Sequence, residues 1–222
     1  MIVESIDGLF GGAVLLAEAS AEMWDDQLGL FAEERQAIAR AVEKRRREFT
    51  AGRLCARSLL AEMGHPASAL LVGDQGAPLW PADIVGSITH CADRCFVALA
   101  ERSRFVGVGI DVEPASPLSE ALLQMVCTPR ELEMGRSWAG VDENWSKIIF
   151  SAKESYYKCY FPIARHVLDF LDVEVQLDPA QRTFIATLRH AALPAAAGRR
   201  ECVGRYRRLG SHLLTASSAQ AV

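Results

Sequence analysis

The sequence has no apolar run long enough to span a bilayer, which takes about 20 residues in a helix. Its amino-terminal stretch is apolar, but Glu4 and Asp7 stand where a secretory signal carries positive charge. Six cysteines are scattered along 222 residues, too sparsely for a disulfide scaffold. We therefore expect a cytoplasmic protein with reduced thiols and no membrane partner.

The sequence also lacks an excess of positive charge, with 24 Lys and Arg against 28 Asp and Glu and a net charge of -4. No global basic field is available to attract nucleic acid or anionic lipid. An anionic ligand must therefore be held by local clusters of cations. The run Lys44–Arg47 is one such cluster, although by itself it is typical of a solvated helix face, above all at Arg46 and Arg47.

A small group of metal-ligating residue types occurs at His90, Cys91 and Cys95. A structural zinc site usually has four ligands in two paired half-sites, and no second pair with suitable spacing follows. Ordinary buried thiols are the favoured interpretation over zinc.

Hydrophobic periodicity predicts an α+β chain. With 50% hydrophobic residues, it can bury a sizeable core as one large domain or two small ones in intimate contact. A Gly/Pro-rich loop at 72–81 separates a helix from strands, and an exposed loop is expected at 193–200. The expected helices span 31–63, 118–134 and 143–160, and the expected strands span 84–90, 95–100, 106–113, 170–177, 183–188 and 206–215.

The strand at 106–113 has two different faces. Alternate side chains share a face, so Val106, Val108, Ile110 and Val112 form an apolar surface. The other face carries glycines at 107 and 109, then Asp111 and Glu113, whose carboxylates can converge on one cation. Oxygen ligands of this kind suit magnesium. Taken alone, the acidic pair is more often a solvent-facing strand end.

The helix at 143–160 has one polar face, on which Lys147, Ser151, Glu154 and Lys158 follow at spacings of four, three and four. Two structural interpretations compete with a functional one. Glu154 and Lys158 can form an ordinary i,i+4 ion pair, and Ser151 with Glu154 fits a capping box. With Asp111 and Glu113, however, Glu154 offers a third carboxylate beside lysines suited to phosphate oxygens.

Four segments in order resemble the phosphopantetheinyl transferases of the monomeric type that activates surfactin and enterobactin synthetases, and most closely their bacterial siderophore and mycobacterial subgroup. The pair GVGIDVEP and FSAKESYYK looks like the signature of this family, SITHC is similar to its Ser-x-(Ser/Thr)-His segment, GDQGAPLWP resembles its G-x-x-G-x-P loop, and KRRREFTAGRLCAR resembles its basic helix. Each motif is weak singly, but their ordered combination is specific and covers more than half of the chain.

The resemblance implies a role for each matching residue. Asp111, Glu113 and Glu154 look like the ligands of Mg2+ (with Mn2+ as an alternative), and Glu154 and Lys158 look like the catalytic base and the group that neutralises the diphosphate. Contacts to coenzyme A are implied for the following residues: Arg45, Arg53, Gly73, Asp74, Thr89, His90, Lys153 and Lys158. One departure is that Val72 and Gln75 are uncharged where relatives often carry basic residues.

The fold that the resemblance implies is α+β, a pseudo-dimer of two similar halves with the active site in the cleft between them. The expected division is 1–110, with the nucleotide grip, and 111–222, with the metal and the catalytic helix. The implied reaction transfers 4'-phosphopantetheine from coenzyme A to a serine of an acyl or peptidyl carrier protein and releases 3',5'-ADP. A monomer without a nucleic-acid partner is expected.

Two other functions remain open from the residues. Acidic triads also serve metal-dependent nucleotide hydrolases and nucleases. A non-catalytic nucleic-acid-binding module could use the helix around Arg45, although the acidic net charge and the lack of an aromatic-basic stacking platform argue against it.

Overall fold

The computed structural model describes residues 8–10, 12–25, 29–138, 142–196 and 198–221. Glu4 and Asp7 lie outside these residues. Within the described part, the first half contains a three-stranded antiparallel sheet of order β1-β3-β2. Its elements are β1 (Val14–Glu18), the 3-10 turn η2 (Ala21–Trp24), α1 (Ala32–Ala37), α2 (Glu43–Glu62), η3 (Asp74–Gly76), β2 (Ile84–Cys91) and β3 (Arg94–Glu101).

The second half contains a five-stranded antiparallel sheet of order β4-β8-β7-β6-β5. Its elements are β4 (Phe105–Pro114), α3 (Glu120–Val126), α4 (Pro129–Trp138), α5 (Trp145–Ala164), η4 (Phe170–Asp172), β5 (Val173–Asp178), β6 (Thr183–Leu188), β7 (Glu201–Leu209) and β8 (His212–Gln220).

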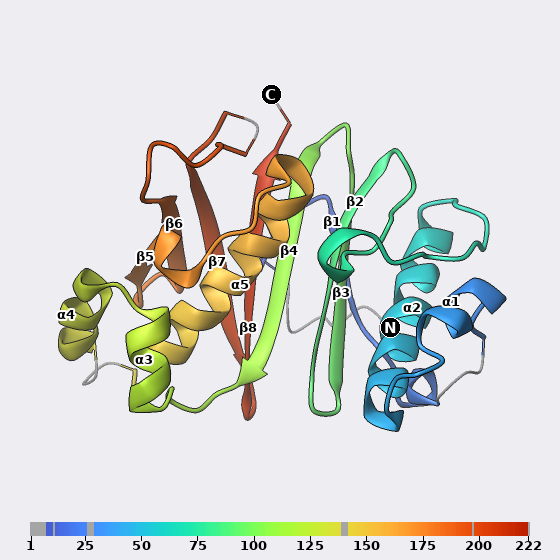
Figure 1. The fold of residues 1–222 in the computed structure, drawn as a ribbon, viewed down its shortest axis with the longest axis horizontal. Helices are drawn as coiled ribbons and strands as arrows, with labels where there is room; N and C mark the ends of the chain where they lie inside the picture. Colours follow the sequence, from blue (N-terminus) through green and yellow to red (C-terminus); the bar gives the residue numbers. More distant parts are fainter. Residues whose placement is uncertain (1–7, 11, 26–28, 139–141, 197, 222) are drawn as a thin grey trace.

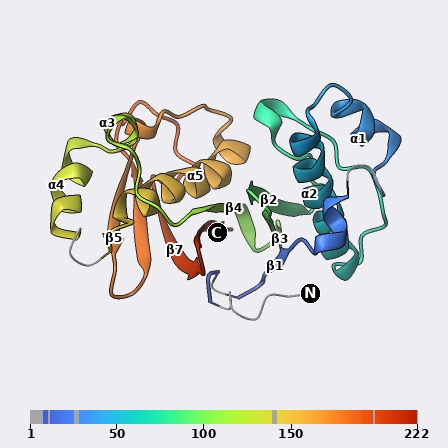
Figure 2. The same ribbon diagram turned by 90° about the horizontal axis from the view of Figure 1, so that it is seen from below.

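The α+β class and the paired halves expected from the sequence are confirmed. Each half has one long helix of 20 residues, α2 or α5, lying against its own antiparallel sheet. Figure 1 shows the two sheets meeting in the middle of the molecule, with α2 on one side and α5 on the other, and Figure 2 shows the same division from below.

The halves meet where β2 packs beside β4. These two strands are not paired by backbone hydrogen bonds; instead, backbone N–H groups of β4 donate to hydroxyl groups of β2. Ile110 N donates to Ser87 Oγ at 3.2 Å, and Val112 N donates to Thr89 Oγ1 at 3.1 Å. On the other side of β4, Val108 and Ile110 pack with Phe96 of β3 in a shared core. The Ser-x-Thr spacing of β2 therefore joins the two sheets, because alternate residues of a strand face the same way.

Four expectations about the elements are corrected. The helix expected at 118–134 is two helices, α3 and α4, because the backbone is extended at Cys127 between them. The helix expected at 31–63 is two helices, because the chain turns after Ala37 and Ile38 packs back on Phe49 of α2 in a small core with Leu30. The strand expected at 206–215 is a hairpin of β7 and β8 that turns at Gly210, whose φ is +63°. Finally, β1 occupies the apolar amino-terminal segment, for which no strand was expected.

The division expected at 110/111 falls inside β4, which pairs along its whole length with β8. The change of sheet therefore comes between Glu101 and Phe105. Among the described residues, none of the helices is both long and apolar enough to cross a membrane.

Candidate active site

Helix α5 packs on the face of β4 that carries Gly107 and Gly109. A side chain at Gly107 would lie 2.6 Å from the carbonyl oxygen of Cys159, and one at Gly109 would overlap the carbonyl oxygen of Ser155. Glycine at both positions thus lets helix and strand backbones approach closely. As a result Asp111, next on this face, points at the polar side of α5.

Asp111 is the centre of the site and is only 4% exposed. Its Oδ1 accepts Lys158 Nζ at 2.6 Å and Thr89 Oγ1 at 3.2 Å, and its Oδ2 accepts Ser151 Oγ at 2.8 Å. The carboxylate therefore joins β2, β4 and α5. Charge-assisted hydrogen bonds of this kind are about twice as strong as neutral ones.

The polar face of α5 forms neither the capping box of Ser151 with Glu154 nor the ion pair of Glu154 with Lys158 that the sequence allows. Ser151 lies inside α5 and donates to Asp111, so it does not cap a helix. Lys158 reaches Asp111, and no ion pair between Glu154 and Lys158 forms among the described residues.

The carboxylates of Glu113 and Glu154 lie close enough to Asp111 for its charge to affect their pKa values. Glu113 is paired with Lys147 at 3.0 Å, whereas Glu154 has no hydrogen bond or ion pair within the described residues. Burial raises the pKa of Glu113 and of Glu154 above the usual value, and Asp111 raises both further, while neighbouring lysines oppose the shift.

Three mutually repelling carboxylates are a donor set that fits a hard divalent cation. In the conformation seen here, no three such groups within the described chain are gathered into a metal-binding cluster. Lys158 and Lys147 neutralise two of the carboxylates instead, so shared ligation requires side-chain rearrangement. Ligation by Asp111, Glu113 and Glu154 stays a prediction.

A cavity of about 240 Å3 opens beside Asp111, at the seam of the halves. It brings together residues far apart in the sequence, from α2, the 72–78 loop, β2, β4 and α5. Six of the expected site residues line it: Arg45, Arg53, Thr89, His90, Asp111 and Lys158. With Glu48, which also lines it, the cavity therefore presents several cations and two acids to a ligand.

His90 and Arg45 contact each other in this cavity. Arg45 Nη1 lies 2.9 Å from His90 Nε2, and His90 Nδ1 lies 3.5 Å from the carboxylate of Glu48. Burial lowers the pKa of His90 below its ordinary value, with Glu48 opposing the shift. Arg46 and Arg47 do not line this cavity; Arg46 donates to the carbonyl of Ala41 and Arg47 to that of Trp24.

Arg53 is the most enclosed cation of the cavity, at 5% exposure. Its Nε donates to the carbonyl of Leu70 at 2.8 Å, and its guanidinium lies 4.2 Å from the ring centroid of Phe49. Burial lowers the pKa of Arg53 to about 10, so the side chain remains charged at neutral pH. Arg53 therefore has a structural role as well as a place in the cavity.

A second cavity, of about 300 Å3, continues from the first past Lys158. It lies between the 74–80 loop and the carboxyl-terminal part of α5, and Glu154 lines it. Asp74 lies at this cavity and pairs at 3.6 Å with Arg165, the residue that follows α5. Gly73 lines neither cavity; its N–H donates to the carbonyl of Ala77 and closes the loop turn.

The two uncharged loop positions are also at the site, since Val72 lines the first cavity and Gln75 the second. Arg165, which follows α5, also lines the second cavity, pairs with Asp74 of this loop, and supplies a cation that the loop itself lacks.

Lys153 lines neither of these two cavities; with Glu154 it lines a smaller one of about 180 Å3. It is 2% exposed and donates to Glu131 Oε2 at 2.8 Å and to the carbonyls of Val126 and Phe170 at 2.7 and 3.0 Å. All three of its N–H groups are therefore used inside the second half, where it joins α5 to the ends of α3 and η4. The expected contact of Lys153 with phosphate is corrected: in this structure the residue is a buried clamp.

We expect Lys153→Met to lower the free energy of unfolding by about 3–5 kcal/mol, because it leaves Glu131 buried without its counter-charge. Urea unfolding followed by circular dichroism measures this loss. Arg130→Met is the control, since its pair with Glu174 leaves Arg130 60% exposed and should contribute at most about 1 kcal/mol. A Lys153→Met protein as stable as the control would contradict the clamp.

Sequence reasoning missed three residues of the site. Ser87 and Glu48 line or support the seam, and Thr215 of β8 lies 2.9 Å from the Ser151 hydroxyl that holds Asp111. Ser87 has a signal in its alternation with Thr89. Glu48 and Thr215 have none, because only the tertiary fold brings them near β2 and α5.

Comparison with known proteins assigns the chain to a family. The profile of the 4'-phosphopantetheinyl transferase N-terminal domain matches residues 33–100, and that of the 4'-phosphopantetheinyl transferase superfamily matches residues 107–206. The chain belongs to this superfamily and is an enzyme that transfers phosphopantetheine to carrier proteins. The resemblance seen in its motifs is thereby confirmed.

Several relatives cover most of the chain. It is 42% identical over 179 residues to 4'-phosphopantetheinyl transferase Svp of Streptomyces mobaraensis, covering 79% of this chain and 72% of Svp. It is 38% identical to Npt of Nocardia iowensis, covering 72% of each chain, and 39% identical to PptT of Mycobacterium tuberculosis, covering 72% of this chain and 71% of PptT.

Proposed function

We propose that this enzyme carries out a divalent-metal-dependent transfer of 4'-phosphopantetheine from coenzyme A to a serine of an apo acyl or peptidyl carrier protein, at the seam between β2, β4 and α5. One observation carries the proposal: Asp111, Lys158 and His90 come from three different elements and line one cavity. We further propose that it acts as a monomer in the cytoplasm.

The cavity residues suit the charge of coenzyme A. The molecule carries a diphosphate and a 3'-phosphate, and its binding calls for several fixed cations. Arg45, Arg53 and His90 form the grip for the nucleotide end, and Lys158 lies between them and Glu154. A cation held by Asp111, Glu113 and Glu154 would polarise the diphosphate when bound.

The protein side chains then divide the remaining work. The carrier serine oxygen forms a bond to the β-phosphorus, and the bond from that phosphorus to the bridging oxygen of the diphosphate breaks, so 3',5'-ADP leaves. Glu154 takes the serine proton; it is available for this because it forms no hydrogen bond or ion pair with another described residue. Lys158, already placed at the seam, stabilises negative charge on the departing group.

The nucleotide grip is tested by His90→Gln and Arg45→Gln. Each should raise the KM for coenzyme A roughly 10- to 100-fold, the equivalent of one charge-assisted hydrogen bond, and leave kcat within a few-fold. Steady-state kinetics and calorimetric binding of coenzyme A measure this. Arg53 is a poorer test, because its buried contact with Leu70 also supports the fold.

His65→Gln is the matched control, since His65 pairs with Asp83 outside the cavity. Desulfo and acylated coenzyme A should be affected as coenzyme A is, because the thiol end lies far from the grip. Unchanged coenzyme A binding in both grip variants would show that the nucleotide binds elsewhere.

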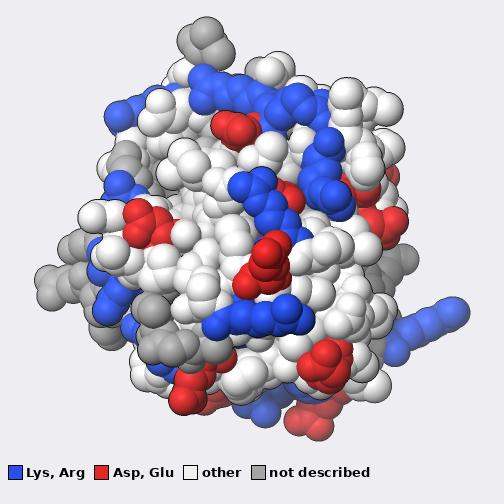
Figure 3. Space-filling view, turned by 90° about the vertical axis from the view of Figure 1, so that its left-hand side faces the viewer, with Lys and Arg blue, Asp and Glu red and all other residues white. Residues whose placement is uncertain are grey.

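The two alternative functions are set aside by the family assignment and the charge. The superfamily is one of transferases, not nucleases or hydrolases. On the face in Figure 3, basic and acidic side chains are interspersed among broad areas of other residues, in keeping with the net charge of -4. That face is the side of α3, α4 and β5 and does not include α2, so the case against a nucleic-acid module on the Arg45 helix is made by the acidic net charge and the family.

A further inference from the structure

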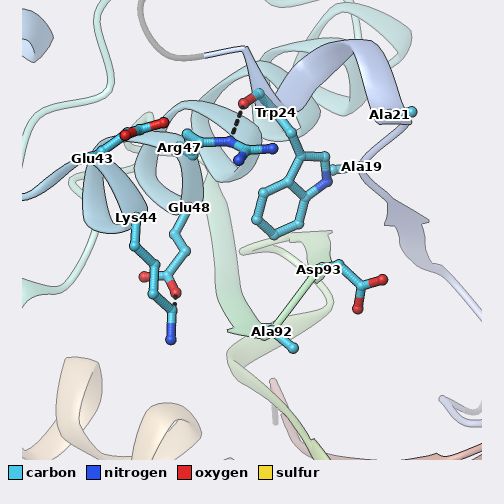
Figure 4. A pocket seen from close by; sticks show the side chains of 9 residues that line it. All are labelled: Ala19, Ala21, Trp24, Glu43, Lys44, Arg47, Glu48, Ala92 and Asp93. Atoms are coloured by element: carbon cyan, nitrogen blue, oxygen red, sulfur yellow. Dashed lines mark hydrogen bonds and ion pairs between the residues drawn. The ribbon is translucent and has the colours of Figure 1, made fainter.

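Glu48 is an acid placed among the cations of the nucleotide grip. It comes from α2, its side chain is 9% exposed, and it lines the 240 Å3 cavity. It also lines an adjoining cleft of about 590 Å3, into which Lys44 and Glu48 point side by side from α2 (Figure 4). The carboxylate thus forms the partition between the two hollows.

The contacts of His90 with Arg45 and Glu48 indicate which ring nitrogen carries the proton. A guanidinium has N–H donors and no acceptor, so Arg45 Nη1 must donate to His90 Nε2, 2.9 Å away. His90 Nε2 is then an acceptor, and the ring N–H is at Nδ1. That atom faces Glu48 Oε2 at 3.5 Å, and the same oxygen lies 3.9 Å from Arg45 Nη1. Glu48 is therefore near both members of the pair.

The negative charge of Glu48 is unexpected in a cavity that is proposed to bind an anion. A carboxylate repels a phosphate, so an acid in an anion-binding cavity should weaken binding. The other charged groups around His90 are Arg45, Lys158 and Asp111, and Glu48 is the acid with the larger effect on the ring. Its place is explained if it orients the groups that bind the anion.

We propose that Glu48 is a positioning residue of the nucleotide grip: its carboxylate accepts the Nδ1–H of His90 and holds the Arg45 guanidinium beside the ring, where both residues line the cavity. This inference rests on the proposed function, since the ligand of the grip is the phosphate of coenzyme A. The arriving phosphate accepts the Arg45 hydrogen bond in place of His90 Nε2, and Nε2 takes up a proton from solvent, which lets it donate to the phosphate as well. Glu48, facing Nδ1, stabilises the imidazolium formed in this way and keeps both side chains in place.

The test compares Glu48→Met with Glu48→Gln. Methionine keeps the length and the helix propensity but has no oxygen acceptor, whereas the glutamine amide oxygen can still accept from Nδ1. Glu48→Met should raise the KM for coenzyme A about tenfold with kcat little changed, and Glu48→Gln should stay within about twofold of wild type. If Glu48→Met fails to fold, Glu48→Ala replaces it.

Glu43→Gln is the matched control. Glu43 is on the same helix and lines the adjoining cleft, and no contact joins it to His90 among the described residues. It removes the same charge and should leave the KM unchanged. A KM that falls equally in Glu48→Met and Glu48→Gln would show that the acid only dampens the positive field, and unchanged KM values in both would also overturn the proposal.

A second readout does not depend on catalysis. Nitrogen-15 spectra of the ligand-free protein should show His90 protonated at Nδ1, and Glu48→Met should move the Nδ1 resonance to that of an N–H without a carboxylate acceptor, with His90→Gln identifying the signal. An unchanged Nδ1 resonance in Glu48→Met contradicts the proposal. If the wild-type protein binds no coenzyme A, the proposed function fails, and these spectra still decide whether Glu48 orients His90.

Discussion

Asp111→Asn is expected to lower turnover about a hundredfold or more, equivalent to about 2.7 kcal/mol of transition-state stabilisation. The substitution keeps the size of the side chain and removes the charge that holds Lys158 and that would hold a cation. Single-turnover transfer to an apo carrier protein measures the loss. Calorimetric titration with Mn2+ should show weaker metal binding as well.

Asp93→Asn is the control for Asp111→Asn, because Asp93 is exposed and lies in the cleft on the far side of Glu48. It should leave turnover and metal binding unchanged. An Asp111→Asn enzyme within a few-fold of wild type would show that the acidic pair on β4 is a structural strand end, and would remove the carboxylate centre from the account.

Glu154→Gln is expected to abolish turnover without lowering the melting temperature. The variant keeps the size of Glu154 but removes its charge and its basicity. Because Glu154 makes no hydrogen bond or ion pair among the described residues, its replacement breaks no contact of the fold. Thermal melts run beside single-turnover assays separate the two effects.

Lys158→Ala should behave differently from Glu154→Gln. It removes the 2.6 Å partner of a buried carboxylate, so it should lower both kcat and the melting temperature. Lys158→Arg should recover only part of the activity, since a planar guanidinium does not replace a compact ammonium. Normal rates in both Glu154→Gln and Lys158→Ala would contradict the roles proposed for α5.

The strand that carries Asp111 and Glu113 was predictable because two local signals agree. Alternating valines and isoleucine predict a strand with one buried face, and the glycines on the other face predict close approach of a neighbouring backbone. That neighbour is α5, whose polar face was also predictable from spacings of three and four. Packing one on the other places Asp111 at Lys158.

The partners of the lysines on α5 were not predictable. Lys153 and Lys158 are five residues apart in one motif, yet Lys153 is buried against Glu131 and Lys158 reaches across the seam to Asp111. Sequence spacing gives the face of a helix but not which distant acid meets it. Glu48 escaped notice for the same reason, because only β2 packing beside α2 brings it to His90.

The seam explains why the site needs both halves. Ser87 and Thr89 of one sheet hold the backbone of β4 in the other, and Thr89 also contacts Asp111 and Lys158. The nucleotide grip on α2 and β2 is thereby set at a fixed distance from the carboxylates on β4 and α5. The site is as rigid as the contact between the sheets, which favours accurate placement of reacting groups.

The central claim, transfer at the β2–β4–α5 seam, is tested most directly by mass spectrometry of an apo carrier protein incubated with the enzyme, coenzyme A and Mg2+. The account predicts that one carrier serine gains the phosphopantetheine mass, with an equal amount of 3',5'-ADP released, and that Asp111→Asn and Glu154→Gln leave the carrier unmodified. Phosphate release without a change in the carrier mass, or full modification by both variants, would contradict it.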